Sequence, residues 1–251
     1  MAGNRESGQC QRGGKRMTVG QRVDILAFGA HPDDVEIGAG GILAKHQTQG
    51  FSVAICDLTA AELSSNGTVE LRRQEAEKAA AVLGLTERVN LGFPDRGLKG
   101  TDEQIRRMIE VIRRLRPRIV LAPYSEDRHP DHVACSRMVK EAVFDAGIRN
   151  RKVDGDWPAH RVEQVFHYFI NDVGPADVIV DITDVYERKM EAILAYASQF
   201  DRSRGEVDTP LNHPSYLAMI RGRDQLWGHQ IRALYGEGLA KTRPLAMDRL
   251  L

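Results

Sequence analysis

Short apolar runs alternate with longer amphipathic stretches along the first 146 residues of the chain. The apolar runs predict buried strands, and the longer stretches between them predict helices. The strands are expected at 23–30, 52–58, 88–91 and 119–122, and the helices at 35–49, 68–83, 102–115 and 133–146. Because strands and helices alternate with short connections, the pattern predicts a Rossmann-like α/β fold, a mostly parallel sheet with helices on both faces.

The alternation loosens after residue 147, where polar segments and prolines interrupt it. Strands are expected at 165–170 and 178–182, helices at 186–199, 215–226 and 227–235, and an extended C-terminal end. We interpret this final part as a continuation of one domain over residues 23–251. Residues 1–22 are polar and rich in glycine, so we expect them to form a disordered extension.

Composition adds mainly exclusions. The 251 residues hold 35 Lys plus Arg and 35 Asp plus Glu, so a net charge near zero gives no reason to expect nucleic acid or an anionic membrane as partner. No apolar run approaches the roughly 18 residues of a membrane span. The three cysteines, Cys10, Cys56 and Cys135, are far apart. That spacing argues against a disulfide framework and favours a reducing cytoplasm.

Two short polar clusters carry the candidate chemistry. His31-Pro32-Asp33-Asp34 directly follows the first predicted strand, and His129-Pro130-Asp131-His132 follows the fourth. Carboxyl ends of parallel strands share one edge of a sheet, where ligands bind. Imidazoles and carboxylates are standard zinc ligands, and a divalent cation would relieve the crowding of acidic groups. The clusters therefore predict a metal-dependent hydrolase, in which the surplus groups act as base, acid or orienting partners.

Each cluster also has a purely structural interpretation. HPDD after a strand suits a turn and a helix N-cap, and HPDH suits a loop that caps the next helix. Cys135 could offer a thiolate ligand, although a small residue facing its helix neighbours is the simpler interpretation. Gly38, Gly40 and Gly41 do not fit the GxGxxG nucleotide fingerprint, so we interpret them as sites of close helix–sheet packing.

AFGAHPDDVEIG at 27–38, together with HPDH at 129–132, resembles the LmbE-like or PIG-L family of zinc-dependent N-acetylglucosamine deacetylases. The resemblance spans about 23–251 and implies three zinc ligands: His31, Asp34 and His132. It implies Asp33 as general base, His129 as the group that stabilises the oxyanion or protonates the leaving amine, and Asp131 as its orienting carboxylate. Fe²⁺ or another divalent ion also suits such ligands. Family precedent further implies a homo-oligomer, with hexamers among its forms.

Four further segments, 57–76, 90–98, 197–200 and 237–245, resemble the branch that deacetylates N-acetylglucosaminyl malate in bacillithiol biosynthesis. This likeness implies a small amino-sugar substrate and the release of glucosaminyl malate and acetate. It also implies that Arg72 binds substrate, a role a guanidinium suits because it can bind a carboxylate through two bonds. Tyr216 or His213 is expected to face the site, since both follow Thr209-Pro210-Leu211. Asp131 is expected to raise the pKa of His129.

Two other functions stay open on the sequence. One keeps the metal and hydrolyses a different amide, such as another N-acetylglucosamine conjugate or a natural-product acetamide. The other is a metal-binding module without catalysis, against which the surplus acid–base residues argue. Substrate selection is expected in the loops at 59–67, 93–100 and 201–216, so substrate profiling separates these alternatives.

Overall fold

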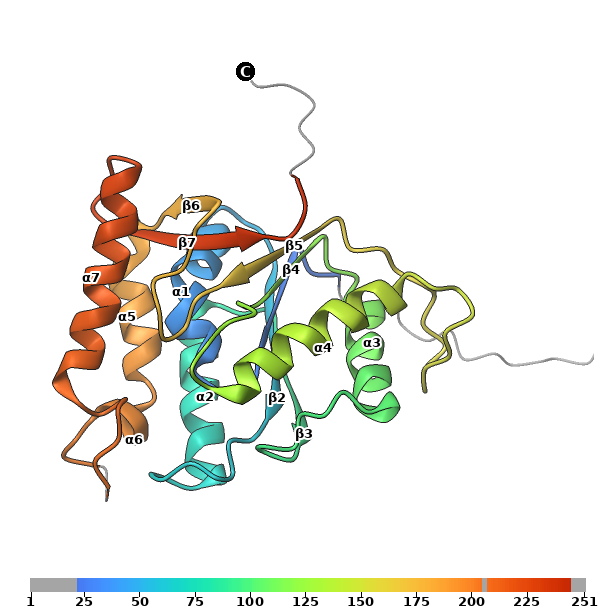
Figure 1. Cartoon of the computed structure of the whole chain (residues 1–251), viewed down its shortest axis with the longest axis horizontal. Coiled ribbons are helices and arrows are strands. Elements are labelled where there is room, and N and C mark those ends of the chain that lie inside the picture. The colour runs from blue at the N-terminus through green and yellow to red at the C-terminus, as the bar shows by residue number, and fades with distance from the viewer. Residues whose placement is uncertain (1–21, 205–206, 245–251) are drawn as a thin grey trace, which may run out of the picture.

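The computed structural model describes residues 22–204 and 207–244, which form a seven-stranded sheet in the order β3-β2-β1-β4-β5-β7-β6 (Figure 1). The strands are β1 (Ile25–Gly29), β2 (Val53–Thr59), β3 (Glu87–Phe93), β4 (Ile119–Pro123), β5 (Gln164–Tyr168), β6 (Val178–Asp181) and β7 (Gly236–Lys241). Strands β1 to β5 pair in parallel, whereas β7 runs antiparallel to both β5 and β6. The predicted mostly parallel sheet is confirmed. The predicted extension, apart from Arg22, lies outside the described residues.

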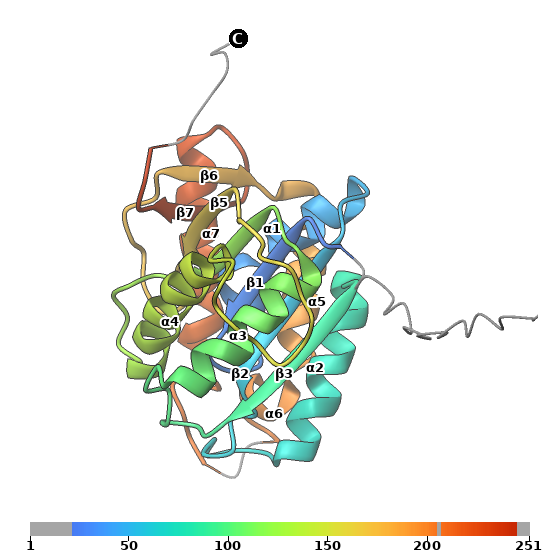
Figure 2. The ribbon, with the colours of Figure 1, turned by 90° about the vertical axis from the view of Figure 1, so that its right-hand side faces the viewer.

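Helices cover both faces of the sheet, as predicted. They are α1 (Asp34–Thr48), α2 (Val69–Leu83), α3 (Asp102–Leu115), α4 (Pro130–Ala146), α5 (Tyr186–Leu194), α6 (Ala197–Phe200) and α7 (Pro214–Gln230), with a 3₁₀ turn η1 (Thr183–Val185). Helices α1, α2, α5 and α7 share one apolar core, and α3 and α4 pack in another on the opposite face. Figure 2 shows α3 and α4 in front of the sheet. Within the described residues, no helix combines the length and apolar character needed to span a membrane.

The alternation of side chains along β1 explains how one strand feeds both cores. Ile25 and Ala27 lie in the core under α1, whereas Leu26 and Phe28 lie in the core under α3 and α4. Side chains of consecutive strand residues point to opposite faces, so a strand buried on both sides is apolar throughout. Cys135 also lies in the α3–α4 core, fully buried, and among the described residues its sulfur is not one of the potential ligand atoms that converge, which argues against the thiolate-ligand alternative.

The glycines of α1 pack closely against the sheet, as the sequence indicated. A Cβ on Gly38 would lie 2.2 Å from the Tyr168 ring, and one on Gly41 would lie 2.7 Å from Ile182. Only a residue without a side chain lets α1 approach this closely. The interpretation as packing positions therefore holds for Gly38 and Gly41, and α1 is fixed in place directly after the first polar cluster.

The C-terminal third departs from the prediction in three places. The helix expected over 186–199 is two helices, α5 and α6, interrupted at Ala195 and Tyr196. The two helices expected over 215–235 are one, α7, which ends at Gln230. The strand β7 was not predicted, since GEGLAK is rich in glycine and lacks the β-branched residues typical of strands. It nonetheless inserts between β5 and β6 and is buried over five of its six residues.

A buried ionic cluster explains why β7 is held in the sheet. Glu237 accepts backbone hydrogen bonds from Gly41 at 2.9 Å and Ile42 at 2.6 Å, both in α1. Lys189 from α5 contacts Glu237 at 2.8 Å and also pairs with Asp224 of α7. The paired side chains of Lys189, Asp224 and Glu237 are fully buried. The cluster therefore joins α1, α5, α7 and β7 through charges that have no access to water.

Replacing Lys189 with methionine is expected to lower the free energy of unfolding by about 3–5 kcal/mol, because buried Glu237 loses its cation and buried Asp224 keeps only Arg223. Urea denaturation followed by circular dichroism measures the change. Lys45→Met is the matched control, since Lys45 pairs at 2.6 Å with an aspartate, Asp184, that is largely exposed. Exposed pairs contribute about 0–1 kcal/mol. Equal effects of the two substitutions would contradict the role assigned to the buried cluster.

Candidate active site

The first cluster occupies the sharp turn between β1 and α1. Gly29 ends the strand where a Cβ would lie only 3.1 Å from the carbonyl oxygen of His31. Asp33 has a φ of 122° and sits at the N-cap position of α1, yet its side chain caps nothing. A positive φ on a residue other than glycine is strained, and such strain gathers at functional sites. The structural alternative for HPDD, a helix N-cap, therefore fails for Asp33.

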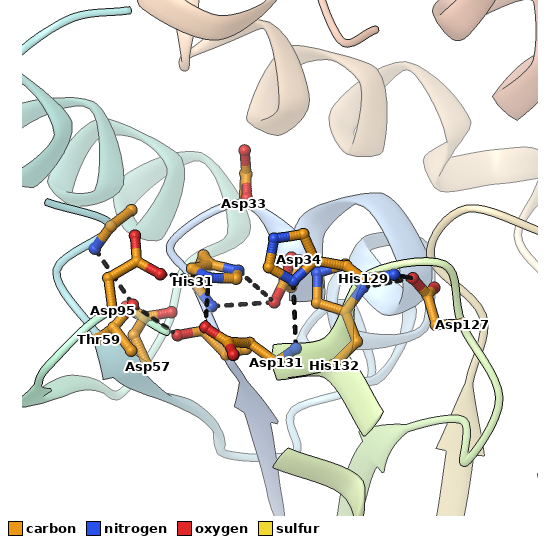
Figure 3. Close-up of polar contacts among 12 residues, drawn as sticks. His31, Asp33, Asp34, Asp57, Thr59, Asp95, Asp127, His129, Asp131 and His132 are labelled. Carbon is orange, nitrogen blue, oxygen red and sulfur yellow. Dashed lines mark hydrogen bonds and ion pairs between the residues drawn. The ribbon is translucent and has the colours of Figure 1, made fainter. Parts of the chain in front are cut away.

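Asp34 lies between two imidazoles at the carboxyl edge of the sheet (Figure 3). Its Oδ1 is 3.1 Å from Nε2 of His132, and its Oδ2 is 3.5 Å from Nδ1 of His31. Figure 3 shows Asp33 standing apart from this row of side chains. The carboxylates of Asp33 and Asp34 thus point in different directions. His31 from the first cluster and His132 from the second both contact Asp34.

Carboxylates contact the outer nitrogen of each of these two imidazoles. Nδ1 of His132 is 2.9 Å from Oδ1 of Asp127, and Nε2 of His31 is 3.3 Å from Oδ1 of Asp95. Sequence reasoning missed Asp127 and Asp95. Asp127 precedes the HPDH cluster by two residues, and Asp95 lies in the segment NLGFPDRGL that carried part of the family resemblance. Each histidine therefore presents one ring nitrogen to Asp34 and the other to an outer carboxylate.

The carboxylates around His31 and His132 favour the protonated, positively charged form of both imidazoles. Burial opposes a charge on His31, but hydrogen bonds with Asp131, Asp34 and Asp95 outweigh it and raise the pKa of His31 well above its ordinary value. Burial likewise opposes a charge on His132, yet nearby carboxylates, Asp34 first, raise its pKa to about 9. A divalent cation supplies the same positive charge and displaces such protons when it binds.

The donor set fits a metal ion. Potential ligand atoms lie within 4.8 Å of one another in two groups, the imidazoles of His31, His129 and His132, and His31 with Asp95 and Asp131. These groupings do not include Asp34, although its oxygens lie nearest to the facing nitrogens of His31 and His132. Buried imidazole nitrogens and carboxylate oxygens are the ligands that zinc takes. More donors converge here than one four-coordinate ion needs.

His129 and Asp131 correct one expectation. Asp131 contacts Arg96, at 3.1 Å from the guanidinium and 2.8 Å from the backbone nitrogen, and lies 3.6 Å from His31. Burial, followed by the charges of His132 and His31, lowers the pKa of His129, and the charges of Asp34 and Asp131 only partly offset this. Asp131 acts on the pKa of His129 in the predicted direction, but its carboxylate also has other partners and its effect is outweighed, so His129 is not kept protonated.

The hydrogen bond at the start of α4 defines the state of the half-buried His129. Its Nδ1 accepts the backbone N–H of Asp131 at 3.2 Å, which makes His129 the N-cap of α4. The structural alternative for HPDH is therefore partly right. With Nδ1 as acceptor, a neutral His129 carries its proton on Nε2. Since no acceptor for that N–H is found among the described residues, it can donate a hydrogen bond within the site.

Arg72 reaches the site from α2 and pairs with Asp33, with Nη2 lying 3.2 Å from Oδ2. Both side chains are buried, and Nε and Nη1 of Arg72 have no hydrogen-bond partner among the described residues. Burial raises the pKa of Asp33 above its ordinary value, and the Arg72 charge opposes that rise. The raised pKa of Asp33 therefore suits a general base. The guanidinium of Arg72 beside it has two hydrogen-bond donors that find no partner among the described residues.

Tyr216 and His213 lie where α7 begins, and they differ. Tyr216 is buried, and its hydroxyl donates to Oδ1 of Asn171 at 3.2 Å. Asn171 in turn donates to Oδ1 of Asp127 at 2.9 Å. His213 instead caps α7 by accepting the backbone N–H of Ser215. The structure therefore links Tyr216, through two residues, to His132, while His213 serves its own helix.

Fold and site together define a class, an α/β enzyme with a metal-binding cluster at the carboxyl edge of its sheet. Residues 26–143 match the family model described as PIG-L, GlcNAc-PI de-N-acetylase. The diacetylchitobiose deacetylase of Thermococcus kodakarensis is 33% identical over 229 residues, which cover 86% of this chain and 81% of that protein. The chain therefore belongs to the PIG-L (LmbE-like) family, and it shares the enzyme class of the deacetylases in that family.

Other relatives widen the picture. A probable N-acetyl-α-D-glucosaminyl L-malate deacetylase of Bacillus subtilis is 26% identical over 82% of this chain and 97% of that protein. A conserved protein of Thermus thermophilus has a solved structure with a TM-score of 0.82 and 37% identity, covering 91% of this chain and 99% of that one. A 4-oxalmesaconate hydratase of Pseudomonas putida is 28% identical over 75% of this chain and 78% of that protein. Because these relatives include both a deacetylase and a hydratase, a test of function must identify which bond of the substrate changes.

Proposed function

We propose that the protein is a zinc-dependent hydrolase that removes the N-acetyl group from an N-acetylglucosamine conjugate. The observation that carries the proposal is Asp34, placed between His31 and His132, with Asp33 diverging from it toward Arg72. The named deacetylases among the relatives support the same reaction.

We assign the metal to His31, Asp34 and His132. Ligand atoms about 2.0–2.2 Å from a tetrahedral zinc ion lie about 3.3 Å from one another. The contacts from Asp34 are of that order: 3.1 Å from Oδ1 to Nε2 of His132, and 3.5 Å from the other oxygen, Oδ2, to Nδ1 of His31. When bound, the cation supplies Lewis acidity toward a water molecule and the acetyl carbonyl. His31 and His132 keep their outer nitrogens on Asp95 and Asp127, which fixes the ring orientation.

Asp33 and His129 divide the proton transfers. Asp33 accepts the proton of the attacking water, since its raised pKa and its position outside the ligand row suit a general base. His129 donates a hydrogen bond from Nε2 to the oxygen that becomes negative as the carbonyl is attacked. Asp131 acts indirectly, because its backbone N–H holds Nδ1 of His129 and its carboxylate holds Arg96. As the C–N bond breaks, the departing amine takes the proton that Asp33 accepted from the water, which returns Asp33 to its carboxylate form.

Replacing Asp127 with asparagine is expected to weaken zinc binding about 10–100-fold, because His132 loses the carboxylate on its outer nitrogen. Asparagine keeps an oxygen that can accept the backbone N–H of His129, which donates to Asp127 at 2.7 Å. Competition with a chelating dye measures the dissociation constant. Glu126→Gln is the matched control, since Glu126 is the exposed neighbour. A dissociation constant unchanged by Asp127→Asn would remove Asp127 from the metal site.

We further propose N-acetylglucosaminyl malate as the particular substrate, as in bacillithiol biosynthesis. The free Nε and Nη1 donors of buried Arg72 support a carboxylate-bearing conjugate. Comparing kcat/KM on N-acetylglucosaminyl malate, diacetylchitobiose and free N-acetylglucosamine tests this choice. Preference for the malate conjugate, lost in Arg72→Ala, is expected. Preference for diacetylchitobiose would reject malate while leaving the class of reaction in place.

Location and assembly are part of the same proposal. A cytoplasmic enzyme that forms a homo-oligomer, up to a hexamer, agrees with the family precedent and with the cysteine content. Light scattering after size exclusion gives the mass of the particle, and a mass of one chain would reject the oligomer.

A further inference from the structure

Asn66 joins two segments that are far apart in the sequence. It lies in the loop between β2 and α2 and is buried, with 3% of its surface exposed. Its Nδ2 donates to the backbone oxygen of Val207 at 2.8 Å, and the backbone nitrogen of Val207 donates to its Oδ1 at 3.0 Å. The side-chain amide thus pairs with backbone as a neighbouring strand would, across 141 residues of sequence.

We call the paired contact between Asn66 and Val207 the junction, and three further hydrogen bonds stabilise it. Gln199 of α6 donates to the backbone oxygen of Asn66 at 2.8 Å. Asn212 donates to the backbone oxygen of Val207 at 2.9 Å, and Thr209 donates its N–H to Oδ1 of Asn212 at 2.9 Å. The junction is therefore built from neutral hydrogen bonds between the loop before α2, helix α6 and the segment before α7.

Both ends of this junction lead into residues of the candidate substrate site. The loop that contains Asn66 runs directly into α2, which carries Arg72. The segment from Val207 runs into α7, whose first turn carries Tyr216. Arg72 pairs with Asp33 at 3.2 Å, and Tyr216 reaches Asp127 through Asn171, so the two segments lead to different parts of the same site.

We propose that Asn66 is a positioning residue, which sets the separation of the Arg72 side and the Tyr216 side of the site and thereby determines affinity for the substrate conjugate. The inference rests on the proposed function for its kinetic consequence. Asn66 makes none of the contacts found around Asp34, so the junction controls substrate binding and leaves the metal ligands unchanged.

Two readouts test the proposal on the full-length, metal-loaded protein. In Asn66→Ala, hydrogen–deuterium exchange in peptides spanning 207–212 is expected to accelerate about tenfold, because the Val207 amide loses its acceptor. With N-acetylglucosaminyl malate or diacetylchitobiose, whichever turns over, KM is expected to rise about tenfold while kcat changes less than about twofold. Zinc content is expected to stay unchanged. Asn66→Asp serves as a second, equally sized variant, which keeps the acceptor for the Val207 amide but replaces the donor to the Val207 oxygen with a carboxylate oxygen.

Ser65→Ala is the matched control, since Ser65 is the exposed neighbour in the same loop, and it is expected to change neither readout. Unchanged exchange over 207–212 in both Asn66 variants would overturn the junction itself. A loss of zinc, or a fall in kcat with KM unchanged, would overturn the positioning role. The exchange measurement needs no turnover, so failure of the proposed function and failure of the junction are separate results.

Discussion

Replacing Asp33 with asparagine is expected to lower kcat about 10²–10⁴-fold while zinc stays bound, because the base is removed and the ligands are not. Asparagine is the appropriate substitution, since Asn tolerates a positive φ better than most residues and Asp33 has a φ of 122°. It also keeps an oxygen near Arg72, which limits the cost of leaving a buried guanidinium without its partner. The rate of acetate release at saturating substrate gives kcat, and elemental analysis gives the amount of bound zinc.

The opposite pattern would reassign the roles. If Asp33→Asn loses zinc, then Asp33 is a ligand, and the two adjacent aspartates have been given each other's functions. If it keeps both zinc and full turnover, a different group accepts the proton of the water.

Replacing Asp34 with alanine is expected to remove both zinc and activity, since Asp34 contacts His31 and His132 together. The loss leaves two buried imidazoles without the carboxylate between them, so metal affinity falls far more than in Asp127→Asn. Zinc content after gel filtration, compared with the unaltered protein, is the measurement. High zinc concentrations are expected to restore little turnover, because only two ligands remain.

Glu36→Gln, in the first turn of α1 close to Asp34, provides the control for general damage to that helix. Glu36 is fully buried and binds Arg88 at 2.6 Å and Tyr196 at 2.9 Å, away from the imidazoles. Its substitution is expected to retain zinc. Retention of zinc in Asp34→Ala would contradict the ligand assignment and favour the group of three imidazoles.

The position of the site could be predicted from the sequence because its polar clusters follow the ends of strands. The runs that become β1 and β4 are apolar throughout; the first polar cluster follows β1 at once and the second follows β4 after a short loop, so the pattern alone predicted that the clusters meet. That inference needed only local signals and the rule that parallel strands share their carboxyl edge.

Contacts between distant residues escaped the sequence. Asp95 lies 64 residues from His31, and nothing in the chain between them indicates the contact. The strand β7 could not be recognised because its stability comes from Glu237 binding α1 and from two antiparallel neighbours, not from its own residues. The contact between Asp131 and Arg96 escaped prediction for the same reason, since Arg96 lies in another loop.

Acetate release with and without metal is the most direct test of the central proposal, that this site hydrolyses an N-acetyl group with a bound metal ion. The protein is stripped with a chelator, assayed on N-acetylglucosaminyl malate and diacetylchitobiose, and assayed again after one equivalent of zinc per chain is added. We predict no release from the stripped protein and full release, with one free amine for each acetate, from the reloaded one. Turnover that persists without metal, or a zinc-loaded protein that releases acetate from neither substrate, would contradict it.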